Sequence, residues 1–314
     1  MDKGTQIYAY GCKWWPAHST MNNNIVSFKN IKKKYSRVEA LSDISFSIPE
    51  NSIFGILGAN GSGKSTLMKI IPGLITDWSG EIYYKDKLVS RNDDILKKEF
   101  GYLIESPTFY EYLSARKNLE LLARISGVVF DRIDAVLQIV NLHERADDIV
   151  SSFSYGMKQR LGIAQVLLND PKVIILDEPN NGLDPNGISD MNRLIKELQL
   201  EGKTICLSTH NLRDVEEICT DVVIFKKGIS SKAISMNNLI SDSNTWSVIV
   251  EYPKVAKKLV EENDNIEIID IHNNKLIIEV VLSAEFGDIQ NTFKQASLLK
   301  INKESNLIRY FKND

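Results

Sequence analysis

The stretch Gly58-Ala-Asn-Gly-Ser-Gly-Lys-Ser-Thr66 decides the fold of this chain. It fills every fixed position of the phosphate-loop pattern G-x-x-x-x-G-K-[ST]. The run Ser52–Leu57 before it predicts a short buried strand, and the run Thr66–Ile71 after it predicts a helix that Pro72 and Gly73 end. Strand, glycine-rich loop and helix in this order predict an α/β fold of the P-loop NTPase class.

The same stretch supplies the chemistry of a phosphate site. Glycines let the backbone approach an anion closely, and the N–H groups at the helix N-terminus favour negative charge. Lys64 is expected to reach the β- and γ-phosphates, and the Ser65 hydroxyl to help hold Mg²⁺. The alternative is a Gly/Ser turn before an ordinary helix, but the filled pattern favours a nucleoside triphosphate. The expected contacts are Gly58, Asn60, Gly61, Gly63, Lys64, Ser65 and Thr66.

Composition narrows the class of protein. The 314 residues are enough for about two domains, and 43% hydrophobic with 25% charged residues is ordinary for a globular protein. The net charge of −3 gives no basic field, so we expect no nucleic-acid partner. Cys12, Cys206 and Cys219 lack metal-ligand spacing, and their unpaired scattering suits a reducing cytosol. Cys206 and Cys219 sit in apolar sequence, which favours small buried thiols.

The sequence contains no apolar run of the ~18–20 residues that cross a bilayer, and no signal-peptide core. If the protein works at a membrane, another chain must supply the span. Residues 1–24 show no clear period and contain the pair Trp14-Trp15. We expect a disordered extension, or a start upstream of a true start at Met21; a contact of the two tryptophans with a membrane or permease is the alternative.

Residues 25–230 alternate between strands and helices. A helical insertion is expected at about 106–150, because apolar residues recur at helical spacing over Leu113–Ile125 and Ile133–Leu142. Phe109, Tyr110 and Tyr112 at its start are either core residues or a docking surface. The expected strands of this domain are Ile25–Phe28, Ile44–Ile48, Ile53–Leu57, Gly80–Tyr84, Val173–Leu176, Thr204–Ser208 and Val222–Phe225, with helices at Gly187–Gln199 and Leu212–Cys219.

Residues 235–314 have a different composition and predict a small α+β appendage. The expected order is strand 246–251, helix 254–263, strands 266–271 and 275–281, helix 284–296 and strand 298–302. Asn273-Asn274 marks a hairpin turn between the two middle strands. This order resembles a ferredoxin-like unit.

The stretch Lys172-Val-Ile-Ile-Leu-Asp-Glu-Pro179 carries two acids at the end of a buried strand. Parallel strands deliver such side chains to their carboxyl edge, where open α/β sheets bind ligands. One carboxylate, Asp177, can hold Mg²⁺ through water, and the second, Glu178, can deprotonate the attacking water.

Another candidate anion site is Ser152-Phe-Ser-Tyr-Gly-Met-Lys-Gln-Arg160, before a helix that we expect to begin near Leu161. Ser154 can cap that helix, whose first N–H groups attract an anion. A simple helix cap is the alternative.

The ordered set of motifs is similar to the ATP-binding subunit of an ABC transporter over residues 25–228. The residues that carry the resemblance are Tyr35, the P-loop, Glu105, Ser154-Tyr-Gly-Met-Lys-Gln159, Asp177-Glu178, Asn181-Gly-Leu-Asp184 and His210.

The resemblance implies a role for each position. Tyr35 would stack on adenine, and Glu178 would be the general base. His210 would contact the γ-phosphate and the attacking water. Ser154 and Gly156 would contact ATP held by the other protomer of a head-to-tail pair, and Asp184 would communicate across that pair.

Departures from the family pattern narrow the subfamily. The signature reads Phe-Ser-Tyr-Gly-Met instead of the common Leu-Ser-Gly-Gly-Gln, and Glu105 stands where Gln is usual. Glu offers only acceptors when ionised. We expect Glu105 to help with Mg²⁺ and to couple it to the helical insertion, unless it is a tolerated variant. These features and the appended domain resemble bacterial transporters that protect against bacitracin and lantibiotics.

The resemblance therefore implies an ATPase, with ATP and Mg²⁺ as cofactors, that powers a separate transmembrane permease from the cytoplasmic face of the membrane. A second copy of the chain completes each ATP site. The cargo would be a peptide antibiotic; an ion, lipid or other drug is the alternative. A non-transport ABC ATPase is less favoured, since the chain has one P-loop and no long heptad insertion. The 235–314 domain could also act as a regulatory or protein-binding module.

Overall fold

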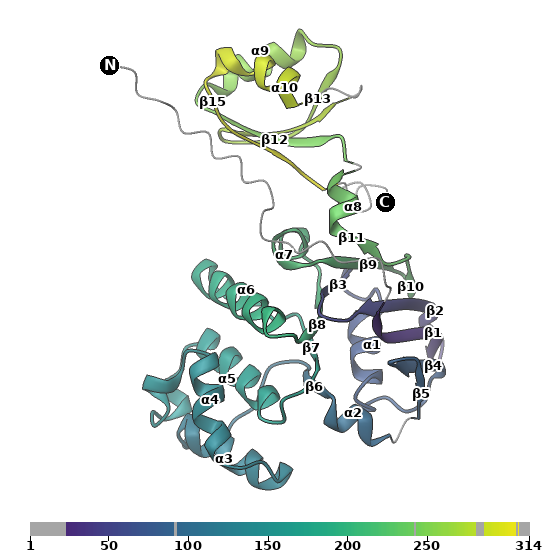
Figure 1. Ribbon diagram of the computed structural model, residues 1–314. Helices are drawn as coiled ribbons and strands as arrows, with labels where there is room; N and C mark the ends of the chain where they lie inside the picture. The colour runs from purple at the N-terminus through teal and green to yellow at the C-terminus, as the bar shows by residue number, and fades with distance from the viewer. Residues whose placement is uncertain (1–22, 91–92, 242, 281–285, 306, 308–314) are drawn as a thin grey trace. The chain divides into compact units, whose positions relative to one another are not determined.

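The computed structural model describes residues 23–90, 93–241, 243–280, 286–305 and 307 (Figure 1). These residues form two compact units that divide between Ser235 and Met236. The expected roles of residues 1–22, including Trp14 and Trp15, lie outside the described residues. Among the described helices, none combines the length and the apolar sequence needed to cross a membrane.

The larger unit is built on one mixed sheet of eleven strands in the order β5-β4-β1-β2-β10-β9-β3-β8-β7-β6, with β11 paired to β9. The strands are β1 (Asn24–Tyr35), β2 (Val38–Pro49), β3 (Ile53–Leu57), β4 (Ser79–Tyr84), β5 (Lys87–Val89), β6 (Phe100–Leu103), β7 (Val173–Asp177), β8 (Thr204–Thr209), β9 (Asp221–Lys226), β10 (Ile229–Ser230) and β11 (Ile234–Ser235).

The central strands β9, β3, β8, β7 and β6 all pair in parallel. Most of their residues are apolar and buried, as in sheets that are covered on both faces. Leu207 of β8 lies opposite Gly55 of β3 and Leu176 of β7, so the three strands end at the same level. This register brings three chain segments to one edge of the sheet.

The main core lies between these parallel strands and the antiparallel strands β1, β2 and β4. Helix α1 (Lys64–Ile70) packs into it through Leu67 and Met68, beside Phe54 of β3. Gly55 faces the opposite side, where a Cβ would lie 2.9 Å from the Cys219 sulfur. Cys219 and Cys206 are buried as expected, and burial raises the pKa of both thiols.

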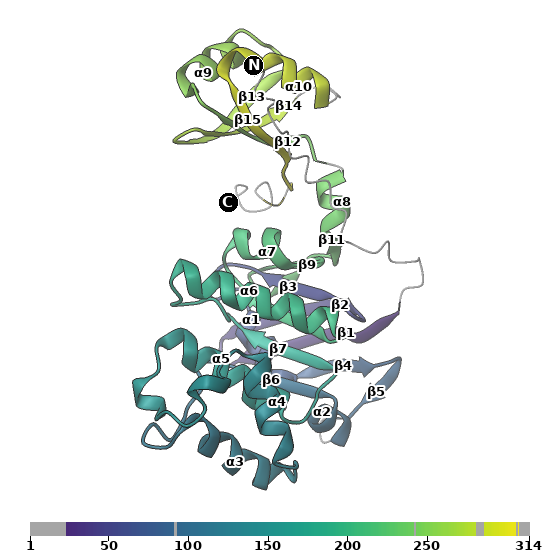
Figure 2. The same ribbon diagram turned by 60° about the vertical axis from the view of Figure 1, so that its left-hand side comes forward.

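The helices of this unit are α2 (Asp94–Lys98), α3 (Ala115–Ser126), α4 (Asp131–Ile139), α5 (Tyr155–Leu167), α6 (Pro185–Leu200) and α7 (Leu212–Ile218). Two short 3₁₀ turns, η1 (His143–Arg145) and η2 (Val150–Ser152), follow α4. Helices α3, α4 and α5 pack on one another beside β6, while α6 and α7 cover β3 and β8 (Figures 1 and 2). The helical insertion is thus attached to the sheet through α5.

Two expectations for this unit were wrong in their boundaries. Helix α5 begins at Tyr155 rather than near Leu161, because the Ser154 hydroxyl accepts a hydrogen bond from Met157 N and starts the helix there. The strands predicted at Ile25–Phe28 and Ile44–Ile48 are parts of a longer hairpin, in which Tyr35 pairs with Val38. Tyr35 is therefore the last residue of β1.

The smaller unit contains α8 (Met236–Ser241), β12 (Thr245–Val250), α9 (Pro253–Glu261), β13 (Ile266–His272), β14 (Lys275–Val280), α10 (Phe286–Thr292), η3 (Lys294–Ala296) and β15 (Leu298–Lys303). Its antiparallel sheet has the order β13-β14-β12-β15. From β12 onward this is the β-α-β-β-α-β arrangement of a ferredoxin-like unit. The expected helix 284–296 is interrupted, since α10 ends at Thr292 and η3 follows Phe293.

The close packing of β6 yields a stability prediction. A Cβ on Gly101 would lie 2.4 Å from Val166 Cγ1 and 2.8 Å from Pro171 Cγ. We expect Gly101→Ala to lower the free energy of unfolding by about 1–3 kcal/mol, because these buried neighbours must move apart. Thermal denaturation measures the change, and Leu88→Ala on exposed β5 is the control. An unchanged midpoint for Gly101→Ala would contradict this packing.

Candidate active site

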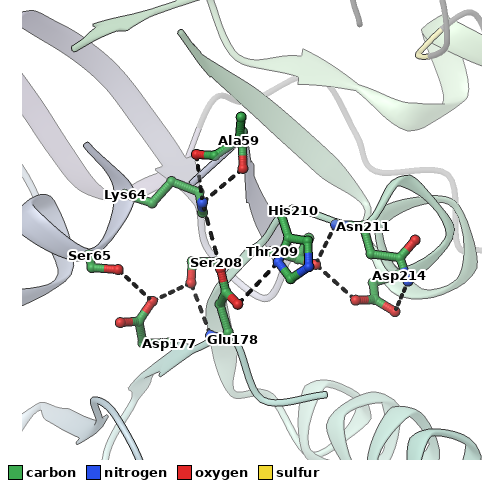
Figure 3. A network of polar contacts seen from close by, with 11 residues as sticks. Ala59, Lys64, Ser65, Asp177, Glu178, Ser208, Thr209, His210, Asn211 and Asp214 are labelled. Atoms are coloured by element: carbon green, nitrogen blue, oxygen red, sulfur yellow. Dashed lines mark hydrogen bonds and ion pairs between the residues drawn. The ribbon is translucent and has the colours of Figure 1, made fainter. Parts of the chain in front are cut away.

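The P-loop joins the end of β3 to the start of α1. Its backbone turns at Gly63, which has φ of 110° and lies so close to Ala40 that a Cβ would be 2.7 Å from the Ala40 carbonyl oxygen. Only glycine fits this position without strain. Lys64 follows, and its buried ammonium donates to the carbonyl oxygens of Gly58 (2.8 Å) and Ala59 (3.2 Å) (Figure 3).

A cavity of about 380 Å³ opens beside this loop. Its size and its two lysines, Lys64 and Lys227, suit a triphosphate, because a P-loop and positive charge border a common space. Its lining residues are Val38, Glu39, Ala40, Asn60, Gly61, Gly63, Lys64, Ser65, Thr66, Glu178, Lys227 and Gly228.

Asp177 ends β7 next to the P-loop. Its Oδ1 lies 3.5 Å from the Ser65 hydroxyl oxygen. A serine hydroxyl and a carboxylate are oxygen ligands of the kind that Mg²⁺ prefers, and Mg²⁺ keeps several waters and binds phosphate as well. Within the described part of the chain no three His, Cys, Asp or Glu side chains form a complete metal cage. Ser65 and Asp177 therefore fit a magnesium ion that arrives with a nucleotide.

Glu178 lies between the P-loop lysine and a histidine. Its Oε2 is 3.1 Å from His210 Nδ1, and its Oε1 is 3.7 Å from Lys64 Nζ. With the carboxylate ionised, Nδ1 carries the proton and donates to it. Glu178 also has a positive φ of 48°, a conformation that costs a residue other than glycine. Glu178 thus presents a partly buried carboxylate on a strained backbone at the cavity wall, where it is placed to take a proton from water.

Ser208 is a residue of this site that the sequence analysis missed. It is completely buried in β8, opposite Asp177 of β7. Its hydroxyl donates to Asp177 Oδ1 and accepts the backbone N–H of Glu178 at 3.0 Å, so one side chain fixes the Asp177 carboxylate and the backbone of Glu178 (Figure 3). A small polar residue inside an apolar strand was the signal, but the pairing partner is 31 residues away in sequence.

Glu105 follows β6 and pairs with a lysine on α1. Its Oε1 lies 2.6 Å from Lys69 Nζ, in a contact open to solvent. The hydrogen bond raises the pKa of Lys69 and lowers the pKa of Glu105. Glu105 has a positive φ of 64°. The lysine thus compensates the charge that Glu brings to this position.

The cavity lining does not include every predicted residue: Gly58, Glu105, Asp177 and His210 are absent from it, and so are Tyr35, Ser154, Gly156 and Asp184. Tyr35 is 44% exposed, and Lys33 Nζ lies 4.5 Å from its ring centre. Ser154 caps α5, and Gly156 lies in the first turn of that helix. Asp184 caps α6 by accepting a hydrogen bond from Gly187 N.

Helix α5, which begins within the signature residues, nevertheless contacts the loop before α6. A Cβ on Gly182 would lie 3.3 Å from the Tyr155 ring, and the Tyr155 hydroxyl accepts a hydrogen bond from Gln159. Tyr155, which departs from the common signature, therefore packs on the segment that carries Asp184.

Fold and site together define a P-loop nucleoside triphosphatase: a phosphate loop after the parallel strand β3, with two acids at the end of β7 in the same sheet. Residues 41–181 match the family described as ABC transporter.

Three proteins with related sequences carry names of the same family. An ABC transporter ATP-binding protein of Bacillus subtilis (strain 168), YhcH, is 37% identical over 76% of this chain and 80% of its own length. The bacitracin transport ATP-binding protein BcrA of Enterococcus faecalis is 32% identical over 91% of this chain and 95% of its length. The lantibiotic transport ATP-binding protein SrtF of Streptococcus pyogenes is 39% identical over 65% of this chain and 88% of its own length.

Two solved structures share the fold. The cbiO1 protein from Clostridium perfringens, described as part of the ABC transporter complex cbiONQ, is 28% identical with a TM-score of 0.64, over 77% of this chain and 96% of that one. The ATP-binding cassette MJ0796, described as dimeric in a post-hydrolysis state bound to ADP and phosphate, is 27% identical with a TM-score of 0.59, over 67% and 98%.

The chain belongs to the family of ABC transporter ATP-binding proteins, and the resemblance seen in its sequence is confirmed. It is an ATPase subunit, and its relatives include bacitracin and lantibiotic transport proteins.

The double contact of Ser208 gives a prediction for this site. We expect Ser208→Ala to cost about 1–3 kcal/mol of stability, because it leaves the Glu178 N–H without its acceptor, and to slow ATP hydrolysis as the Asp177 carboxylate and the Glu178 backbone lose this contact. Chemical denaturation and a steady-state ATPase assay measure the two effects. Ser189→Ala on the exposed side of α6 is the control. Normal turnover in Ser208→Ala would show that the acids are held by other contacts.

Proposed function

We propose that this chain powers the expulsion of a peptide antibiotic of the bacitracin or lantibiotic type, acting on a separate transmembrane permease. The observation that carries the proposal is the alignment with the bacitracin transport protein BcrA over 91% of this chain, a span too long for the larger unit alone. The lantibiotic transport protein SrtF, which is similar over 65% of the chain, supports the same class of cargo.

We propose that the predicted site residues act as follows. Gly58, Asn60, Gly61, Gly63, Lys64, Ser65 and Thr66 bind the phosphates, and Tyr35 stacks on the adenine ring. Ser65 and Asp177, with help from Glu105, would hold Mg²⁺, which screens the phosphate charge when it is bound. The distance of 3.5 Å between the Ser65 and Asp177 oxygens supports this assignment.

In the hydrolytic step Glu178 accepts a proton from the attacking water, whose oxygen forms a bond to the γ-phosphorus while the bond to the β,γ-bridging oxygen breaks. Lys64 stabilises the charge on the phosphates. His210 holds Glu178 through the 3.1 Å contact and faces the γ-phosphate. The strained backbone of Glu178 supports this role, because such strain is common at catalytic positions.

Residues that do not line the P-loop cavity support the proposed contact with a second copy of the chain. Ser154 and Gly156 do not line this cavity, which fits a role toward ATP held by a second copy. Asp184, whose loop packs on Tyr155, would carry the signal between the two copies. The described dimer of the related cassette MJ0796 supports a pair of this kind.

A surface of the helical insertion suits the permease. A cavity of about 450 Å³ lies between the 108–110 segment and α3, and its apolar lining includes Phe109, Leu121 and Ile125. Tyr110 and Tyr112 are 57% and 74% exposed, which speaks against the core alternative for these two residues. Asn118 fixes this segment by accepting from Tyr110 N at 2.9 Å and donating to Tyr110 O at 3.1 Å. A rigid exposed apolar surface supports docking of another protein.

This assembly implies a position at the cytoplasmic face of the membrane, held by the permease. We assign residues 25–230 to the nucleotide-binding domain, with the insertion at about 106–150, residues 235–314 to an accessory domain, and residues 1–24 to an extension. The division between Ser235 and Met236 supports the two larger assignments.

Replacing the proposed base tests the mechanism. We expect Glu178→Gln to bind ATP normally but to lower turnover about 10²–10⁴-fold, because the amide cannot accept the proton of water. ATP should then hold two copies together, which size-exclusion chromatography detects. Glu197→Gln, an exposed acid of α6, is the matched control. Wild-type turnover in Glu178→Gln would remove this residue as the base.

Antibiotic susceptibility tests the cargo. We expect the full chain, expressed with its neighbouring membrane-protein genes in a sensitive bacterium, to protect against bacitracin or lantibiotics but not unrelated drugs. Protection should disappear in Glu178→Gln, since transport needs hydrolysis. No protection by an assembled complex with active ATPase would refute the peptide cargo and favour an ion, lipid or other drug.

A further inference from the structure

Asp214 is a buried acid beside the active site that the hydrolytic step does not use. It lies in the first turn of α7 and is only 7% exposed. Burying a carboxylate is costly unless hydrogen bonds replace its water. What its two oxygens contact therefore indicates what the residue does.

Both contacts of Asp214 go to residues that flank His210. Its Oδ2 accepts a hydrogen bond from the Thr209 hydroxyl at 2.8 Å, and its Oδ1 lies 3.4 Å from Asn211 Nδ2. The Thr209 hydroxyl in turn accepts the Asn211 N–H at 3.0 Å. Figure 3 shows this set of contacts on one side of His210 and Glu178 on the other.

The ring of His210 needs such support because packing does not fix it. Its side chain is 48% exposed, and it lies just after β8, which ends at the buried Thr209. Among the described residues, Glu178 orients the ring, because its Oε2 lies 3.1 Å from His210 Nδ1. A shift of the 209–211 backbone would move Nδ1 out of hydrogen-bonding range of Glu178.

Asp214 also borders the space in front of these residues. A polar cavity of about 120 Å³ is lined by Glu178, Thr209, His210, Asn211 and Asp214, among others. Asp214 thus belongs to the same polar cluster as Glu178 and His210, and its hydrogen bonds go to Thr209 and Asn211.

We infer that Asp214 is a positioning residue that holds His210 in contact with Glu178 by fixing Thr209 and Asn211. This inference rests on the role proposed for His210. It predicts that loss of Asp214 affects turnover and leaves nucleotide binding intact, because the side chains of Thr209 and Asn211 that it contacts do not line the P-loop cavity. Thr209 meets the P-loop through its backbone carbonyl oxygen, which accepts the Gly58 N–H at 3.2 Å within the pairing of β8 with β3. It also predicts that Asp214 has no effect once the histidine is gone.

The test is a double-mutant cycle on ATP hydrolysis by the purified full-length chain. We expect Asp214→Ala to lower kcat about 10- to 100-fold, as for a support of a catalytic group, with little change in KM for ATP. Asp214→Asn, which keeps an acceptor for Thr209, should recover part of the loss. In a His210→Ala background, Asp214→Ala should lower kcat no further. Glu217→Ala, an exposed acid on the same helix, is the control.

The outcomes separate the inference from the proposed function. The positioning role alone would be overturned if Asp214→Ala lowered kcat equally in the wild-type and His210→Ala backgrounds. It would also be overturned if His210→Ala slowed hydrolysis but Asp214→Ala did not. Normal kcat in His210→Ala would overturn the role of the histidine and the inference with it. If Asp214→Ala does not fold, Thr209→Val tests the same link, since it removes the hydroxyl that Asp214 accepts from and preserves the shape. Thr209→Val must then lower kcat when His210 is present and must leave kcat unchanged in the His210→Ala background.

Discussion

The parallel pairing of β3, β8 and β7 is the constraint on which the rest of the site depends. The P-loop follows β3, the two acids follow β7, and His210 follows β8. Because parallel strands end at the same edge, the chemical groups of three distant segments meet there. Ser208 joins two of these strands by bonding to both Asp177 and Glu178. A slip of one residue in this pairing would separate the base from the phosphate site.

Apolar burial maintains that pairing, and strain is confined to a few polar positions. Phe54, Ile56, Leu67 and Met68 are fully buried where β3 meets α1. At the edge of the sheet, Glu178 adopts a positive φ that the surrounding hydrogen bonds must hold. The rigid core therefore allows a strained residue to persist at the position for which we propose the catalytic base.

Charge balance explains how the unusual Glu105 is accommodated. Glutamate in place of glutamine adds a negative charge near Asp177, but Lys69 of α1 reaches Glu105 at 2.6 Å. The pair connects the helix that begins in the P-loop with the segment that leads into the helical insertion. Exposed pairs of this kind add little stability, and the coupling role of Glu105 stays a prediction.

The sequence by itself determined the P-loop, the strand with Asp177 and Glu178, the family and the order of strands and helices in the smaller unit from β12 onward. These features are local: a nine-residue motif, apolar runs, and a turn at Asn273-Asn274 where φ becomes positive. Only the tertiary structure decided the partners of Ser208, Asp214 and Lys69, which depend on strand register and packing between distant segments. The start of α5 at Tyr155 was also missed, although its cause, the cap by Ser154, is local. Short motifs identify chemical groups, but the contacts that orient those groups arise only when the sheet forms.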